Sequence, residues 1–267
     1  MILEPVNGEW SASGIRSQSI AHAGLARQLR AMTPIARWKL LALALMGPRP
    51  TLFLEALRVN GCLQSLLPEL DALFGVPHGC SDIDPVDTGM HQLRLLARLS
   101  RDGEPLEVRF AALMHKIGRA GAAGAPPVQA RRGRALLDGL AARIAVPPQA
   151  LELARLVIDE ADSVQRACAL RAGALADLLD RTRALRPRDQ FDRLLRICSA
   201  DHAAFPGHAN AGCPKVGLVR RAAAIWDTAC VDGMAAEAAR HARAEAISQA
   251  LCAVTFASRE RATSTTA

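Results

Sequence analysis

Two histidines and a lysine stand at helix positions where metal chemistry is often found. The segment FAALMHKIGRAG (110–121) is an apolar run that ends in His115 and Lys116 and continues into a glycine-containing loop. Many metal-dependent phosphohydrolases carry a His-Asp pair at such a helix end, because imidazole nitrogen and carboxylate oxygen both bind divalent cations. Lys116 has no lone pair to offer as an ammonium. The segment is therefore an altered metal site, a site with another use, or part of an ordinary core helix.

A second histidine is spaced so that a helical hairpin brings it to the first. His91 lies 24 residues before His115, and Gly103 is midway between them, in a segment that predicts a turn. Antiparallel helices that fold back at Gly103 place each histidine about 18 Å from the turn, at 1.5 Å per residue. The rings then meet if they face each other. On the spacing alone, two ordinary polar residues near helix ends remain an alternative.

The rest of the chain predicts an all-α fold of about nine or ten helices, with no convincing strand. Thr33 and Pro34 begin a helix that runs to Met46. It is apolar on more than one face, so we expect it to be buried. Residues 75–87 are predicted to form a loop. Further helices are expected at 51–59, 89–100, 104–116, 128–145, 148–162, 172–184, 188–201, 215–230 and 233–254. Residues 63–73 are expected to form only a short helical piece that Pro68 interrupts.

Composition predicts a cytoplasmic protein without a disulfide framework or a zinc ribbon. Half of the residues are apolar, but no apolar run approaches the roughly 20 residues that a membrane span needs, and the N-terminus lacks a signal-peptide pattern. The seven cysteines are odd in number and form no C-x-x-C pair. We expect reduced and mostly buried thiols.

The charge balance permits contact with phosphate backbones. Net charge is +7, and 30 of the 33 basic residues are arginines, with Lys39, Lys116 and Lys215 the exceptions. Aromatic residues make up only 3% of the chain, which argues against a platform that stacks bases. Any contact with nucleic acid is expected to depend on arginine and on helix N-termini that read phosphates and shape.

Most of the chain resembles a known family. The similarity is strongest in TPIARWKLLALAL (33–45), RPTLFLEALRVNGCLQSLLPELDALFGVP (49–77), DTGMHQL (87–93) and EVRFAALMHKIG (107–118), and weaker at 146–157, 199–201 and 213–229. These stretches resemble the C-terminal half of the bacterial CCA-adding enzymes, the class II tRNA nucleotidyltransferases that carry an HD phosphohydrolase domain. The resemblance implies an irregular N-terminus (1–24), neck and body helices (25–77), a degenerate HD-like helical domain (78–205), a helical tail (206–256) and a disordered end (257–267).

The resemblance implies a metal site that has lost a ligand. His91 matches the family's first histidine, His115 the histidine of the His-Asp pair, and Asp201 a later aspartate. Lys116 stands where the aspartate of the pair would be. A family histidine farther along appears as Ala161, and the family's histidine-rich stretch contains no histidine here (PPVQARRG, 126–133).

The lysine changes the local charge by two units. Each unit charge near 4 Å is worth about 4 kcal/mol at an effective dielectric of about 20, which is ample to abolish ordinary metal affinity. No cofactor is therefore expected. If the site is still competent, Ni, Mn, Mg or Zn would bind at His91, His115 and Asp201. Either the ammonium of Lys116 occupies the place of the ion and pairs with Asp201, or the side chain extends into solvent.

The family's nucleotidyl-transfer chemistry resides in an N-terminal head with a D-x-D pair. No head fits in the roughly 24 residues before the first matching helix. SDID (81–84) spells D-x-D with Asp82 and Asp84, but it is expected to be a solvated acidic loop. A truncated or mis-assigned start of the chain would also explain the missing head.

Three functions follow from the resemblance. The first is a non-catalytic, headless paralogue of the CCA-adding enzyme that retains tRNA, RNA or phosphate binding through Arg131, Arg132, Arg134, Arg220 and Arg221, which solvated helix surface explains equally well. The second is a surviving HD-type phosphohydrolase, a phosphatase or 2′,3′-cyclic phosphodiesterase with an altered metal site. The third is a nucleotidyltransferase component that needs a separately encoded head acting in trans.

Overall fold

The chain forms two compact units of helices. The computed structural model describes residues 24–80, 83–121, 125–184, 188–210 and 212–264. The units are Met1–Leu151 and Glu152–Ala267, and the predicted HD-like domain (78–205) extends over parts of both. The fold is all-α, as predicted, although the helices outnumber the nine or ten expected because several are short.

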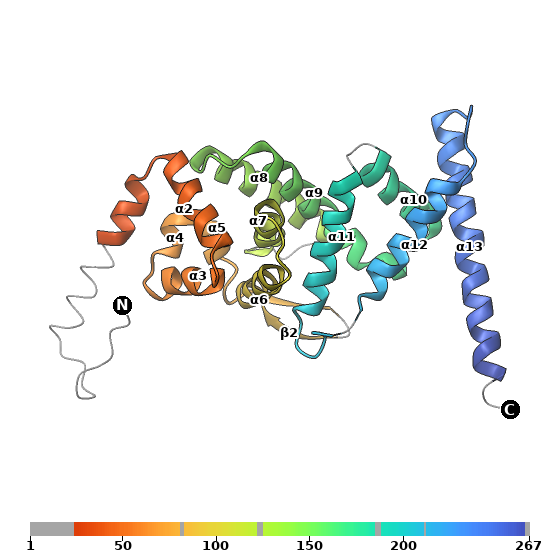
Figure 1. Ribbon diagram of the computed structural model, residues 1–267, viewed down its shortest axis with the longest axis horizontal. Helices are drawn as coiled ribbons and strands as arrows, with labels where there is room; N and C mark the ends of the chain where they lie inside the picture. Colours follow the sequence, from red (N-terminus) through yellow and green to blue (C-terminus); the bar gives the residue numbers. More distant parts are fainter. Residues whose placement is uncertain (1–23, 81–82, 122–124, 185–187, 211, 265–267) are drawn as a thin grey trace. The chain divides into compact units, whose positions relative to one another are not determined.

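The first unit contains helices before, within and after the predicted hairpin (Figure 1). They are α2 (Pro34–Met46), α3 (Pro50–Val59), α4 (Leu63–Leu66), α5 (Pro68–Asp71), α6 (Thr88–Arg101), α7 (Leu106–Met114), the 3₁₀ turn η1 (Ile117–Arg119) and α8 (Pro126–Arg143). The predicted cap of α2 is confirmed, because the Thr33 side chain accepts a hydrogen bond from the backbone N–H of Ala36.

The predicted hairpin of α6 and α7 is present. Gly103 adopts a left-handed φ of +71° at the turn, which favours glycine, and the two helices pack against each other. Arg109 of α7 fastens the hairpin. Its guanidinium donates to the carbonyl oxygens of Glu104 at 2.7 Å and Leu45 at 2.7 Å, and to the hydroxyl of Ser100 at 3.2 Å. The turn at Gly103 and the hydrogen bonds of Arg109 together fix the register in which α6 and α7 pack.

The prediction that residues 75–87 form a loop without strands was wrong. β1 (Pro77–Cys80) and β2 (Ile83–Asp87) form an antiparallel pair in which His78 lies opposite Val86. The strands are short and contain Pro and Gly, so no alternation of apolar and polar residues marks them. Asp87 caps α6 by accepting from the N–H of Met90 at 2.7 Å.

The expectation that α2 is buried was also wrong. Leu41 and Leu45 are fully buried, but Leu43 is 75% exposed and Ile35 is 61% exposed. The helix packs with one face toward α3 and α7, so its other apolar residues remain in solvent. Apolar character on several faces therefore did not mean burial on several faces.

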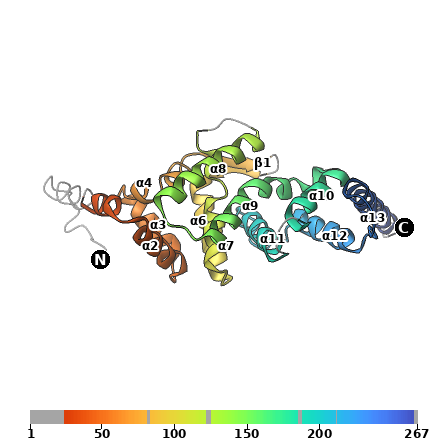
Figure 2. The same ribbon diagram turned by 90° about the horizontal axis from the view of Figure 1, so that it is seen from above.

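Helix α8 lies against η1 through its backbone. A Cβ added to Gly118 would come within 2.0 Å of the carbonyl oxygen of Gln129 and 2.8 Å of the backbone nitrogen of Gly133. Only glycine permits so close an approach. Figure 2 shows α8 along the upper part of the first unit in that view. The contact ties the segment after Lys116 directly to an arginine-bearing helix.

The second unit is a further helical bundle. It contains α9 (Pro148–Gln165), which begins at the boundary, η2 (Ala167–Ala169), α10 (Ala172–Leu179), the π-helical turn η3 (Asp180–Ala184), α11 (Arg188–Ala203), α12 (Pro214–Thr228) and α13 (Ala236–Ser264). Helices α10, α12 and α13 pack together (Figures 1 and 2). α13 ends at Ser264, within the segment 257–267 for which the sequence predicts disorder.

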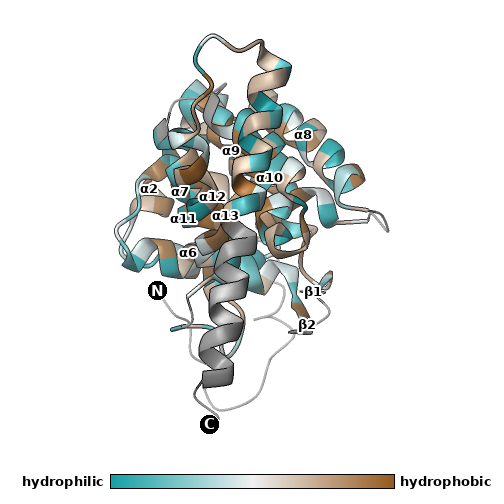
Figure 3. Ribbon diagram, turned by 90° about the vertical axis from the view of Figure 1, so that its right-hand side faces the viewer, coloured by the Kyte–Doolittle hydropathy of each residue, from teal (hydrophilic) through white to brown (hydrophobic). Residues whose placement is uncertain are grey.

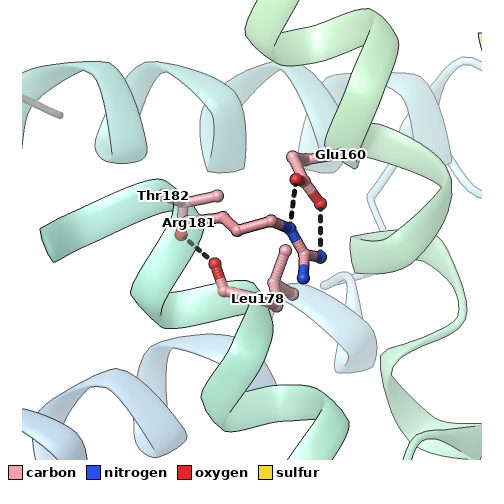
Figure 4. A network of polar contacts seen from close by, with 4 residues as sticks. All are labelled: Glu160, Leu178, Arg181 and Thr182. Atoms are coloured by element: carbon pink, nitrogen blue, oxygen red, sulfur yellow. Dashed lines mark hydrogen bonds and ion pairs between the residues drawn. The ribbon is translucent and has the colours of Figure 1, made fainter. Parts of the chain in front are cut away.

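An ion pair between an exposed arginine and a buried carboxylate holds the π-helical turn to α9 (Figure 4). Arg181 donates to both carboxylate oxygens of the buried Glu160, at 2.7 and 2.9 Å. These hydrogen bonds raise the pKa of Arg181. The Thr182 hydroxyl donates to the carbonyl oxygen of Leu178 at 2.7 Å, which occupies a carbonyl of the preceding turn and accompanies the local widening of the helix.

The described helices are amphipathic, and the described thiols are free. The helices in Figure 3 show both teal and brown stretches, as amphipathic helices do. No helix in the described part of the chain combines the length and hydropathy needed to cross a bilayer. Five described cysteines are free thiols; Cys62, Cys198 and Cys213 are buried and Cys168 and Cys230 are exposed.

Candidate functional site

His91 lies in the first half of α6, fully buried, beside a histidine that the sequence analysis did not use. His78 of β1 places its ring centroid 4.8 Å from that of His91, with the ring planes inclined by 72°. One ring nitrogen of each lies within 4.8 Å of the other. Two buried imidazoles therefore meet where α6 begins and the strand pair ends. His78 was missed because the strands that carry it were predicted to be a loop.

His115 is held in one tautomer by its surroundings. Its Nδ1 is 2.7 Å from the carbonyl oxygen of Ala112, a distance at which Nδ1 must carry the proton and donate it. The buried Gln92 lies 3.2 Å from the same nitrogen and donates its amide N–H groups to the carbonyl oxygens of Ala112 and Leu113, at 2.9 and 3.1 Å. The second ring nitrogen, Nε2, consequently carries the lone pair, as it does in histidines that bind metals.

The hairpin brings His115 beside the start of α6. There His115 contacts Gln92, the residue that follows His91. Among the described residues, the donors that gather within 4.8 Å of one another include His78 and His91 and do not include His115. The spacing argument thus placed the two predicted histidines on the two packed helices of the hairpin, and the strand adds a third imidazole beside His91.

Lys116 is buried, with 5% of its surface exposed. It follows His115 directly and precedes η1, which is pressed onto α8. The alternative in which the lysine simply extends into solvent was therefore wrong. A long cationic side chain is rarely buried unless its ammonium has polar partners, and Lys116 does make polar interactions in the structure.

Asp201 belongs to the second unit and lies in α11, 3% exposed. Gln165, the last residue of α9, donates to one of its carboxylate oxygens at 3.1 Å and to the carbonyl oxygen of Cys198 at 3.0 Å. The amide therefore fixes the orientation of the carboxylate. Ala161, one turn before Gln165, is buried and offers no ligand.

The D-x-D segment is only partly described. Asp82 lies outside the described residues, and Asp84 belongs to β2, so it is on a strand and not in the predicted loop. The stretch 126–133 forms the first half of α8, without histidine.

The five candidate phosphate-binding arginines are exposed. They lie on two helices, one in each unit: Arg131, Arg132 and Arg134 on α8, and Arg220 and Arg221 on α12. The guanidinium of Arg132 extends over Gly121, 3.3 Å from where a Cβ would be. Their exposure agrees with contact to phosphates and equally well with solvated helix surface, the alternative that the sequence left open.

The donors of the first unit suit a borderline metal ion better than a hard one. Imidazole is a ligand for Zn, Ni and Cu, whereas Mg and Mn prefer carboxylate and water oxygens. His78 and His91 could hold such an ion. Lys116 is buried in the same unit, and its side chain replaces the carboxylate that the resemblance assigns to this position.

Comparison with known proteins gives one consistent result. The chain is 35% identical over 244 residues to the Multifunctional CCA protein of Cupriavidus taiwanensis, a match that covers 85% of the chain and 58% of the relative. It is 35% identical over 211 residues to that of Nitrosomonas europaea (77% and 50%) and 36% identical over 198 residues to that of Laribacter hongkongensis (71% and 48%). No protein-family profile and no solved structure matches.

The chain spans about half the length of the curated relatives that it matches. This agrees with the resemblance to the C-terminal half of CCA-adding enzymes found in the sequence. The chain therefore belongs to the family of the multifunctional CCA proteins.

Proposed function

We propose that this chain is a non-catalytic, tRNA-binding relative of the CCA-adding enzymes. The helical scaffold remains in use, and the metal chemistry of a degenerate HD domain is lost. The observation that carries the proposal is the burial of Lys116, the residue at the position of a metal-binding aspartate. Because tRNA is its partner, the protein would act in the cytoplasm.

The charge argument supports the loss of metal. Substituting an ammonium for a carboxylate removes one ligand and places a repelling charge in a site where little water screens it. We propose that the ammonium takes the role of the ion. Gln165, which orients the carboxylate of Asp201, and Gln92, which orients His115, keep the polar groups in place without an ion.

The arginines of α8 are proposed as the principal contact with tRNA phosphates. Arg131 and Arg132 are exposed, and the helix is held to η1 by the Gly118 contact, so the charges are presented on a rigid element. A rigid array loses little conformational entropy when it binds a phosphate backbone. Arg220 and Arg221 on α12 would add contacts from the second unit.

The first experiment measures tRNA affinity by gel shift at moderate salt. The Arg131→Ser, Arg132→Ser double variant should bind at least fivefold more weakly than the unaltered chain, because each phosphate contact contributes through counterion release. The matched control is Arg27→Ser, Arg49→Ser, which removes the same charge from two other exposed positions of the first unit. If both double variants bound tRNA equally weakly, the affinity would depend on net charge alone, and the assignment of the tRNA contact to α8 would be wrong.

A second candidate function is an HD-type phosphohydrolase with a rebuilt metal site. His78 favours it, since this buried imidazole beside His91 could compensate for the lost ligand. Metal analysis and hydrolysis of 2′,3′-cyclic nucleotides decide between the two candidates. Near-stoichiometric Ni, Mn or Zn, with hydrolysis that His78→Gln abolishes, would support the enzyme; hydrolysis no faster than the buffer blank would exclude it.

The third function, nucleotidyl transfer with a head in trans, needs a partner that carries a D-x-D pair. Its test is co-purification of such a protein with the tagged chain, followed by addition of CCA to tRNA by the pair. If no such partner co-purifies, nucleotidyl transfer in trans is excluded, and the proposal of a non-catalytic tRNA-binding protein is retained.

A further inference from the structure

Two more histidines lie together in the second unit. His202 is in the last turn of α11, and His208 is in the segment that leads to α12. Their ring centroids are 4.6 Å apart, with the planes inclined by 43°. Neither imidazole has a hydrogen-bond partner among the described residues, and Nδ1 of His208 is itself buried. A buried polar atom without a partner is costly, so such an atom in a native structure calls for an explanation.

The charged groups near His202 are the ammonium of Lys215 and the carboxylate of Asp201. The two fixed charges nearby, Lys215 and Asp201, have opposite signs, so neither a cation nor an anion is excluded by net charge.

The ring separation agrees with two imidazoles on one ion. A metal–nitrogen bond of about 2.1 Å places a ring centroid about 3.2 Å from the ion. When a nitrogen of each ring binds the same ion, centroids 4.6 Å apart subtend an angle of about 90° at that ion. That angle separates adjacent ligands in the tetragonal coordination that Ni²⁺ and Cu²⁺ adopt.

We propose that His202 and His208 form a two-imidazole binding site for a divalent transition metal of the nickel type, with solvent completing the coordination. Phe205 packs near His208, with ring centroids 6.5 Å apart, and helps to hold the second ring in position. The site uses none of the histidines of the first unit, and it does not depend on tRNA binding.

The test is calorimetric titration of the full chain with Ni²⁺. It is done in a Cys168→Ser, Cys230→Ser background, because exposed thiols also bind nickel. His202→Gln and His208→Gln should each weaken one binding event at least tenfold. His241→Gln, which removes an exposed histidine of α13, should leave it within twofold.

A second readout leaves both proposed histidines in place. In proton NMR of the Cys168→Ser, Cys230→Ser chain, paramagnetic Ni²⁺ should broaden the ring resonances of His202 and His208 at lower concentration than those of His241. Nickel affinity unchanged in both glutamine variants, or preferential broadening of other histidines, would overturn the proposal. So would binding of inorganic phosphate, and not of nickel, that Lys215→Met abolishes.

Discussion

At the scale of the residue, the proposed function depends on Lys116. Its neighbour His115 donates from Nδ1 to the carbonyl oxygen of Ala112, as histidines that bind metals through Nε2 do. Lys116 is buried at the position where the resemblance places a carboxylate. Our proposal is that this position retains the orienting hydrogen bonds of a metal site and that the lysine side chain takes the place of the ion.

Restoring the carboxylate should restore part of the metal affinity. We expect Lys116→Asp to bind Mn²⁺ at least tenfold more tightly than the unaltered chain, because the change adds an oxygen ligand and removes a positive charge. Lys116→Gln, which removes only the charge, should be intermediate. Electron paramagnetic resonance of free Mn²⁺ measures all three. Stoichiometric Mn²⁺ binding by the unaltered chain would mean that the lysine does not exclude the ion.

At the scale of the element, buried polar anchors hold the hairpin in register. Arg109 is 5% exposed and reaches carbonyl groups in the last turns of both α2 and α6. Burial lowers the pKa of Arg109, yet a guanidinium remains charged in proteins. Its removal leaves helix-end carbonyls without donors.

Arg109→Met should lower the free energy of unfolding by about 3 kcal/mol, since several buried acceptors lose a charged donor at once. Urea denaturation measures the change. The control is Arg101→Met, an exposed position on α6, which should stay within about 0.5 kcal/mol. If the two variants were equally stable, Arg109 would not be the anchor described above.

The contact between η1 and α8 gives an equally direct comparison. Gly118→Ala forces a methyl group against the backbone of Gln129 and should cost about 2 kcal/mol or more. Gly139→Ala, on α8 with open space around it, should be neutral or stabilise by up to about 1 kcal/mol. Thermal unfolding of both variants compares them. Equal effects would show that α8 and η1 are not in close contact.

The sequence predicted the helices of the first unit better than it predicted the strands and the burial of single side chains. The spacing of His91 and His115 about Gly103 predicted the α6–α7 hairpin, because helix geometry is regular enough to extrapolate over a dozen residues. The sequence did not predict the β1–β2 pair, because short strands with proline and glycine have no periodic signal. The position of His78 beside His91 was missed for the same reason. The burial of Lys116 could not be read from its type, because a lysine at a helix end is as easily exposed as buried.

At the scale of the whole molecule, the central question is whether the helical scaffold binds tRNA. Net charge is +7 and the candidate arginines are exposed. The logarithm of the binding constant should fall linearly with the logarithm of salt concentration, with a slope of roughly −0.7 to −0.9 for each phosphate contacted. Titrations between about 50 and 200 mM salt give that slope, and the α8 double variant should reduce it by about two units.

The most direct test is the affinity of the unaltered chain for tRNA in the presence of EDTA. The protein should bind tRNA at least tenfold more tightly than an unrelated protein of the same net charge does. EDTA should not change the affinity, because in our proposal Lys116 takes the place of a metal ion. Binding no tighter than that of the unrelated protein, or binding that appears only when divalent metal is added, would contradict the account.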